Sequence, residues 1–107
     1  NKKNSIIKLG KFDFNRNLKT LSDEKENLIN LTNLESRLLL ILFENLNKTL
    51  NEDFLLKHVW GYSSNASSNT IKTHIWRLRK KIYNNDDNIF NLETKSNGYV
   101  LKHKRII

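Results

Sequence analysis

Residues 69–82 read NTIKTHIWRLRKKI, and the spacing of their apolar members predicts an amphipathic helix. A helix that turns about 100° per residue stacks four of them on one stripe, which requires a core. These four are Ile71, Ile75, Leu78 and Ile82. The opposite face and its flanks hold hydrogen-bond donors and one large ring: Asn69, Thr70, Lys72, Thr73, Trp76, Arg77, Lys80 and Lys81. Such a helix fits the major groove of DNA, although many globular helices expose a basic face only to water.

Positive charge is concentrated in the C-terminal part of the chain. The net charge is +8 and the isoelectric point is near 9.8. Residues 69–107 contain nine Lys or Arg and three Asp or Glu, whereas residues 1–68 contain ten and eight. This asymmetry favours a polyanionic partner, because neutralised phosphates release their bound counterions. A basic surface that is merely solvated is the alternative.

Composition excludes several other classes of protein. The 107 residues are enough for one core, and we expect a single domain over residues 1–107. The absence of cysteine excludes disulfides, thiolate metal sites and thiol catalysis. No apolar run approaches the length of a membrane span and no signal peptide is visible, so we expect a cytoplasmic protein without membrane contact.

The histidines give no sign of a catalytic or metal site. His58, His74 and His103 lack both the paired spacing of metal ligands and a nearby cluster of acids. We therefore expect no enzyme activity, no metal and no cofactor.

The first part of the chain is predicted to form an N-terminal sheet over residues 6–31. Four short apolar runs are separated by turn-forming residues, as in an antiparallel meander. The expected strands are Ile6–Leu9, Phe12–Phe14, Leu18–Leu21 and Leu28–Leu31.

Three helices are predicted to form a core over residues 32–83. Thr32 and Glu35 have the spacing of a capping box, which begins the first helix. Asn51 caps a second helix that runs to Trp60 and ends at Gly61. A polar loop then leads into the third helix. Three helices within about fifty residues have the size of a helix-turn-helix core.

The last predicted element is a β-hairpin wing over residues 89–102. Two alternating runs, residues 89–94 and 99–101, flank a four-residue connection from Lys95 to Gly98. A hairpin directly after a basic helix is typical of a winged helix.

Five short motifs follow one another along the chain. They are Leu31-Thr32-x-x-Glu35, Leu38-Leu39, Leu55-x-x-x-Val59-Trp60-Gly61, Thr70-Ile71-x-x-His74-Ile75-x-x-Leu78-Arg79-Lys80-Lys81 and Gly98-Tyr99. Together they resemble the DNA-binding effector domain of OmpR/PhoB-type response regulators. The resemblance covers nearly the whole chain and implies an α+β fold. This fold is a winged helix-turn-helix with an N-terminal four-stranded antiparallel sheet, three helices and a C-terminal β-hairpin wing, in agreement with the patterns above.

The resemblance also implies a function and a set of site residues. The function is sequence-specific binding of double-stranded DNA in transcriptional regulation. The residues implied to face the major groove are Asn69, Lys72, Thr73, Trp76 and Arg77. Those implied to lie near phosphates are Trp60, Thr70, His74 and Arg79, to which the charge of the helix adds Lys80 and Lys81. The wing is expected to bring Lys95, with Asn97 and Tyr99, to the adjacent minor groove.

Several protein partners are implied as well. The family segment that contacts RNA polymerase corresponds here to Gly61, Tyr62, Ser63, Ser64, Asn65, Ala66 and Ser67. The family further implies an upstream receiver domain, a sensor kinase acting on it, and a homodimer on DNA. The chain begins at Asn1 without an initiator Met, so we expect it to be a piece of a longer polypeptide.

Three departures from the family pattern leave alternatives open. Asn69 and Lys72 stand where relatives often have Arg and an acid, so no relative's base preference transfers to this chain. Trp76 takes a usually polar place, which fits a thymine-methyl or sugar contact, or packing against Tyr83 or a neighbouring protomer. The wing turn, Lys95–Gly98, replaces the more usual Arg-Gly-x-Gly. The alternative function is a winged-helix module that docks a protein or RNA partner, with Trp76 as its anchor.

Overall fold

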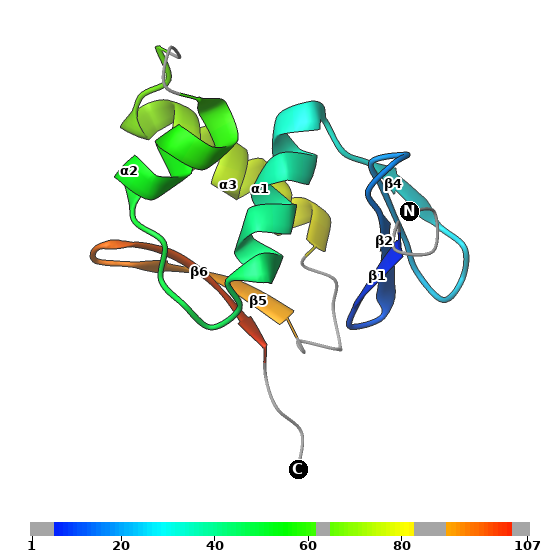
Figure 1. The fold of residues 1–107 in the computed structure, drawn as a ribbon. Helices are drawn as coiled ribbons and strands as arrows, with labels where there is room; N and C mark the ends of the chain where they lie inside the picture. The colour runs from blue at the N-terminus through cyan, green and yellow to red at the C-terminus, as the bar shows by residue number, and fades with distance from the viewer. Residues whose placement is uncertain (1–5, 62–64, 83–89, 104–107) are drawn as a thin grey trace.

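The computed structural model describes residues 6–61, 65–82 and 90–103. A four-stranded sheet comes first along the chain, helices follow, and a two-stranded hairpin comes last. In Figure 1 the four-stranded sheet lies at the right, the first helix stands near the centre and the hairpin lies below the helices.

The N-terminal sheet is an antiparallel meander in the order β1-β2-β3-β4. Its strands are β1 Ile6–Leu9, β2 Phe12–Asn15, β3 Thr20–Ser22 and β4 Leu28–Asn30. Alternate residues of β2 are buried, so Phe12 and Phe14 face the core while Asp13 between them is only partly covered. Phe14 pairs with Leu21 of β3, and neither side chain reaches solvent. This face of the sheet therefore closes one side of the core.

Four strand boundaries of this sheet differ from the prediction. β2 and β3 each run one residue further than predicted, to Asn15 and Ser22. The third strand begins at Thr20 instead of Leu18, because Lys19 has a left-handed backbone with a φ of 57°. The side-chain oxygen of Asn15 accepts hydrogen bonds from two backbone N–H groups of the turn, each over 3.0 Å. Leu18 consequently lies in the turn and is 70% exposed. The fourth strand ends at Asn30, one residue earlier than predicted.

Helix α1 spans Asn33–Glu44 and begins with the predicted capping box. The Thr32 hydroxyl accepts the backbone N–H of Glu35 over 3.1 Å, and the Glu35 carboxylate accepts the backbone N–H of Thr32 over 2.9 Å. The buried side of α1 belongs to the same apolar cluster as the sheet, through Leu38, Leu39 and Leu42. α1 thus joins the sheet to the remaining helices.

The second helix has two geometries. It is α-helical over Glu52–Leu55, labelled α2, and continues as a π-helical turn, η2, over Leu56–Trp60. Asn51 caps it as predicted, because its side-chain oxygen accepts a backbone N–H of the first turn over 2.8 Å. The backbone N–H of Gly61 donates to the carbonyl of Leu56 over 2.8 Å, which closes the wider turn. The helix therefore ends where predicted, with a widening that was not predicted.

Helix α3 spans Ser68–Ile82 and begins one residue earlier than predicted. All four members of its apolar stripe are buried in the main cluster: Ile71, Ile75, Leu78 and Ile82. Their burial fixes the rotation of α3 about its own axis, and therefore which side of the helix meets solvent.

The hairpin consists of β5, Phe90–Lys95, and β6, Gly98–His103. The last residue of β5 pairs with the first of β6, so the connection has two residues and not the predicted four. Leu50, just before α2, exchanges two backbone hydrogen bonds of 2.7 and 2.9 Å with Tyr99. The wing is thereby fastened to the helical part of the molecule.

These observations confirm the predicted α+β winged helix-turn-helix architecture. Within the described ranges, no helix combines the length and the apolar character that crossing a membrane requires.

Candidate nucleic-acid interface

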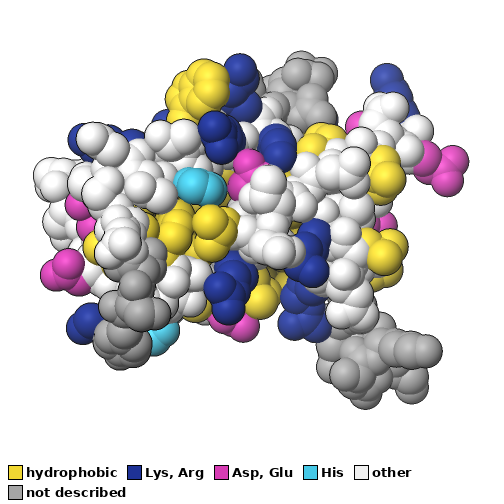
Figure 2. Space-filling view, turned by 90° about the horizontal axis from the view of Figure 1, so that it is seen from above, with side chains coloured by type: hydrophobic (Ala, Val, Ile, Leu, Met, Phe, Trp, Pro, Cys, Tyr) yellow, Lys and Arg dark blue, Asp and Glu magenta, His cyan; other side chains and the backbone are white. Residues whose placement is uncertain are grey.

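The outward side of α3 carries all five residues predicted for the major groove. Each of them is exposed, since the buried stripe lies on the other side of the helix. They are Asn69, Lys72, Thr73, Trp76 and Arg77. In Figure 2, Lys and Arg side chains gather around an exposed hydrophobic side chain at the upper edge of the molecule. These side chains are accessible to a partner; their contacts with DNA stay a prediction.

Two cations on this face form no ion pair with any described acid. Within the described part of the chain, neither Lys72 nor Arg77 takes part in an ion pair. The Arg77 guanidinium, which has no such pair, is a planar fork of the kind that binds two acceptors on guanine. On the same face, Thr73 donates its hydroxyl hydrogen to the backbone carbonyl of Asn69 over 2.9 Å, which fixes the Thr73 rotamer.

Trp76 and Lys80 form a pair on the same face. The Lys80 ammonium lies 4.3 Å from the centroid of the Trp76 ring, which is cation–π geometry. Trp76 nevertheless remains 56% exposed. Tyr83, which the sequence offered as an alternative partner for Trp76, lies outside the described residues.

A second cluster of predicted site residues lies beside the first half of α3. His74 Nδ1 is 2.9 Å from the carbonyl oxygen of Thr70, so Nδ1 carries a proton, because a carbonyl only accepts. The Trp60 ring meets His74 edge-on, with centroids 5.4 Å apart. The Trp60 indole N–H is buried and finds no acceptor among the residues described.

Arg79 connects α3 to the wing. Its Nε donates to the carbonyl of Leu92 over 2.9 Å, and a terminal nitrogen donates to the hydroxyl of Thr94 over 2.9 Å. Both acceptors belong to β5. Arg79 was predicted only as a phosphate contact, whereas two of its donors orient the hairpin relative to the helix.

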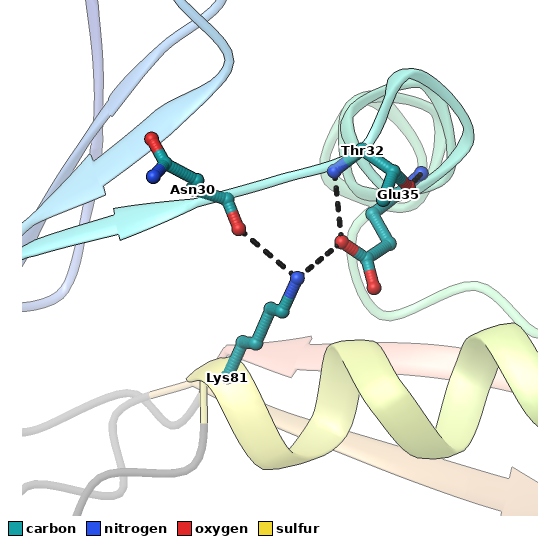
Figure 3. A network of polar contacts seen from close by, with 4 residues as sticks. All are labelled: Asn30, Thr32, Glu35 and Lys81. Atoms are coloured by element: carbon teal, nitrogen blue, oxygen red, sulfur yellow. Dashed lines mark hydrogen bonds and ion pairs between the residues drawn. The ribbon is translucent and has the colours of Figure 1, made fainter.

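Lys81 is also engaged inside the protein. Its ammonium lies 2.6 Å from a Glu35 carboxylate oxygen and donates to the carbonyl of Asn30 over 3.0 Å. Figure 3 shows this ammonium and the Thr32 backbone N–H converging on the same oxygen of Glu35. The network joins the end of β4, the start of α1 and the end of α3. Lys81, predicted as a phosphate contact, thus neutralises a carboxylate that is only 1% exposed.

Glu35 is ionised despite its burial. Burial is the largest single influence on the pKa of Glu35 and raises it, but the Lys81 ammonium and the hydrogen bonds with Thr32 together outweigh burial. The pKa consequently lies below its ordinary value of 4.5. The carboxylate is therefore negative at neutral pH, as the ion pair with Lys81 requires.

Two of the three residues predicted for the wing contact reach solvent. Lys95 is exposed, although its ammonium already lies 3.0 Å from a Glu93 carboxylate oxygen. Asn97 is exposed in the turn. Tyr99 is only 5% exposed and belongs to the core, and its burial, followed by the charge of Glu52, raises the pKa of its hydroxyl. Tyr99 thus supports the wing from beneath.

An open groove of about 530 Å³ separates the start of α3 from the wing turn. Charges of both signs line it: Glu52, Asp53, Lys72 and Lys95. The Ser68 hydroxyl donates to Glu52 over 2.8 Å and ties α3 to α2 at this edge. The described residues contain no group of three side chains suited to holding a metal ion. The groove therefore does not offer a uniformly positive surface.

The predicted polymerase-contact loop is only partly described. Tyr62, Ser63 and Ser64 lie outside the described residues. Asn65 and Ser67 are exposed, and the Ser67 hydroxyl lies 3.4 Å from the backbone nitrogen of Thr70 at the start of α3. A contact with RNA polymerase stays a prediction.

A comparison with protein families accounts for the arrangement. The family model described as "Transcriptional regulatory protein, C terminal" matches residues 24–101. The chain belongs to this family. The matched span runs from before α1 into β6, so the exposed face of α3 lies wholly inside it. The predicted membership in the OmpR/PhoB-type effector domains is confirmed, and such a domain is the non-catalytic C-terminal part of a transcriptional regulatory protein.

Full-length members of the family are longer than this chain. The response regulator ArlR of Staphylococcus aureus is 35% identical over 74 residues, which cover 69% of this chain and 34% of ArlR. The transcriptional regulatory protein VxrB of Vibrio cholerae is 44% identical over 54 residues, which cover 50% of this chain and 22% of VxrB. The chain spans between about a fifth and two fifths of the length of the curated relatives it matches.

Solved structures of the family share the fold. The DNA-binding domain of CssR from Bacillus subtilis superposes with a TM-score of 0.73 at 25% identity, over 84% of this chain and 98% of that one. The DNA-binding domain of RstA from Klebsiella pneumoniae, solved in complex with the RstA box, superposes with a TM-score of 0.72 at 21% identity, over 91% and 96%.

Sequence reasoning missed the polar network at the end of α3. Glu35 was assigned only to the capping box and Asn30 only to a strand, although both hold Lys81. Glu35 and Lys81 are 46 residues apart, and no local spacing reports such a pair. The available signal was the position of Glu35 within an apolar helix, since a buried carboxylate requires a cation or several donors.

Proposed function

We propose that this domain binds double-stranded DNA with sequence preference, as the effector part of a transcriptional response regulator. α3 lies in the major groove with Asn69, Lys72, Thr73, Trp76 and Arg77 toward the base edges. Lys80, Thr70 and His74 approach the phosphates on either side, and the wing brings Lys95 and Asn97 toward the adjacent minor groove. The solved RstA complex supports this proposal, because its fold is the same.

One observation carries the proposal: α3 is held by its buried stripe, and its exposed face presents Lys72 and Arg77, which form no ion pair within the described part of the chain. The stripe beneath α3 is buried, so the helix arrives already ordered and only the side-chain tips lose freedom on binding. Lys72 and Arg77 pair with no acid among the described residues, so no internal ion pair has to break. Lys81 and Tyr99 are left out of the proposed contact set, because the protein already uses their polar or apolar groups internally.

The proposal extends to the partners that the family implies. The loop before α3 contacts RNA polymerase, two copies bind DNA together, and an upstream receiver domain modified by a sensor kinase controls them. The relatives' greater length supports an additional domain, since ArlR is about three times as long as the matched segment. The protein acts in the cytoplasm in this proposal.

The test compares Arg77→Ala with a charge-matched control. Duplexes are selected from a random pool with the unmodified chain, and affinities are then measured on a selected and a scrambled duplex at one salt concentration. Arg77→Ala is expected to weaken binding to the selected duplex by about 1 to 3 kcal/mol more than binding to the scrambled duplex, which loses only the contribution of one charge. Lys25→Ala removes an equal charge from the exposed loop between β3 and β4, outside the proposed contact set, and is expected to change neither affinity appreciably.

Two outcomes contradict the proposal. Equal losses for Arg77→Ala on both duplexes mean that Arg77 contacts phosphate and not bases. Failure of the pool to yield any preferred duplex, together with indifference to DNA at modest salt, favours docking of RNA or protein instead.

A further inference from the structure

The largest exposed side chain of α3 stands in the middle of its polar face. Trp76 is 56% exposed, whereas the other apolar residues of the helix are buried. Thr73 and Lys80 are its neighbours one turn away on the same face, and Arg77 is adjacent in the sequence. Any surface that meets this face of α3 must therefore meet the indole ring.

A cation lies over the Trp76 ring before any partner binds. The Lys80 ammonium is 4.3 Å from the ring centroid and occupies one face of the indole. This contact favours the observed position of Trp76 and leaves the uncovered part of the ring directed at the solvent. A ring that already favours this position loses less rotamer freedom on binding than one without a partner.

Only one base offers an apolar group in the major groove. Guanine, cytosine and adenine present hydrogen-bond donors and acceptors there, whereas thymine also presents its 5-methyl group. The indole N–H is a single donor, and most of the exposed ring surface is carbon. An exposed carbon surface between polar neighbours on a groove-reading helix therefore matches a thymine methyl better than any other base edge.

We propose that Trp76 contacts the 5-methyl group of a thymine and makes the domain prefer T·A at that position of its site. The inference rests on the proposed function, because it requires α3 to lie in the major groove. Lys80 is a positioning residue in this arrangement, since it acts on the base only through the ring. A second copy of the chain packing on Trp76 is the rival explanation, and the experiment below separates the two.

The experiment removes one methyl group at a time from the DNA. Each thymine of a selected duplex is replaced by deoxyuridine, which keeps the hydrogen-bonding edge and lacks only the 5-methyl group. The unmodified chain is expected to lose about fourfold in affinity at one thymine, the effect of one buried methyl. Trp76→Ala is expected to bind the thymine duplex more weakly and to show no further loss with deoxyuridine at that position.

Three variants control the measurement. Arg77→Ala is expected to bind weakly but to keep the deoxyuridine effect at the Trp76 position, because it leaves the ring in place. Trp76→Phe keeps an apolar ring and is expected to retain part of the effect. Lys80→Gln removes the cation above the ring and is expected to reduce the effect. Thermal melting followed by circular dichroism checks folding, and Trp76→Ala is expected to melt as the unmodified chain does, because the side chain is mostly exposed.

The outcomes separate this inference from the function on which it rests. If no duplex is selected, the proposed function and the inference both fail. If a duplex is selected but deoxyuridine affects the unmodified chain and Trp76→Ala equally at every thymine, only the inference fails. If Trp76→Ala leaves single-site affinity unchanged and abolishes cooperative binding to two adjacent sites, the ring belongs to an interface between copies and the inference is wrong.

Discussion

The pair formed by Lys81 and Glu35 shows how far a residue's role can depend on its surroundings. Both side chains are charged, yet in the ion pair the Glu35 side chain is only 1% exposed and the Lys81 side chain 30% exposed. Sequence reasoning correctly assigned Glu35 to the capping box, because that interaction spans three residues. It assigned Lys81 to DNA, because the ion pair between Lys81 and Glu35 cannot be derived from helical spacing.

The pKa of Glu35 makes the stability of the domain sensitive to acid. Its value in the folded state lies below the ordinary 4.5, so the stabilisation is fully present above about pH 4.5 and is lost as the pH falls through the folded value. We expect Glu35→Gln to be less stable than the unmodified chain at pH 7 and to lose less stability on acidification. Urea denaturation at pH 7 and at pH 3.5 measures both quantities.

The comparison between the two proteins is needed because other carboxyl groups titrate in the same range. Hydrogen bonds with Asn27 lower the pKa of Asp23, and Lys95 lowers the pKa of Glu93. Both groups are present in the variant, so their contributions cancel in the difference. Parallel loss of stability in the two proteins contradicts the assignment to Glu35.

Removing the lysine of this pair is expected to affect stability more than DNA binding. Lys81→Met leaves the Glu35 carboxylate buried beside Thr32 with one donor fewer. We expect a loss of about 1 to 3 kcal/mol at pH 7, the cost of an unsatisfied buried group. Because the proposed contact set omits Lys81, the affinity of the folded variant for a selected duplex is expected to fall less than that of Arg77→Ala. If Lys81→Met lowers the free energy of binding by more than the free energy of unfolding, Lys81 contacts DNA after all.

At the scale of elements, the helices were predicted more accurately than the strands. The capping box at Thr32 and the Asn51 cap are local interactions, and both were found at the predicted residues. The third strand and the wing turn were misplaced because their limits depend on backbone conformation. Lys19 adopts a positive φ without being glycine, and the wing turn tightens to two residues because β5 and β6 pair to their ends.

The wing depends on a glycine for a steric reason. A Cβ atom at Gly98 would lie 2.1 Å from the carbonyl oxygen of Leu50, which no real structure accommodates. The backbone must then separate from Leu50 and weaken the hydrogen bonds that fasten the hairpin. We expect Gly98→Ala to destabilise the domain by about 2 kcal/mol or more, measured by urea denaturation.

Gly61 provides the matched control for this substitution. Its φ of 93° is also unfavourable for alanine, but a Cβ there meets no atom of the described structure within 4 Å. Gly61→Ala is therefore expected to cost about 1 kcal/mol, from backbone strain alone. Equal losses for the two variants contradict the role assigned to the contact between the wing and Leu50.

At the scale of the whole molecule, only some of the positive charge counted in the sequence remains unpaired in the folded protein. Within the described residues, Lys81 is paired with Glu35 and Lys95 with Glu93, while Lys72, Arg77 and Lys80 form no ion pair. Net charge therefore indicated the end of the chain that carries the exposed cations of α3, but it overstated the number of cations without an ion pair among the described residues. Tertiary contacts determine which cations are left for a partner to bind, and these contacts cannot be derived from a count of charged residues.

The remaining free charge predicts a salt dependence. With about three phosphates neutralised by these cations, the logarithm of the association constant is expected to fall against the logarithm of salt concentration with a slope near −3. Titrations of a scrambled duplex between 50 and 200 mM salt measure this slope. Lys80→Ala is expected to reduce its magnitude by about one, and a slope near zero contradicts a nucleic-acid partner.

The network at the end of α3 has a consequence for engineering. The exposed face of α3 can be tested for its proposed role by grafting it onto another domain of the same fold. Here a graft limited to residues 69–80 preserves the anchor at Lys81, whereas transplanting the entire helix into another host separates that lysine from its carboxylate. A chimera that contains the complete helix therefore also needs a glutamate at the position of Glu35. Without it, the transplanted Lys81 ammonium has lost the carboxylate with which it pairs.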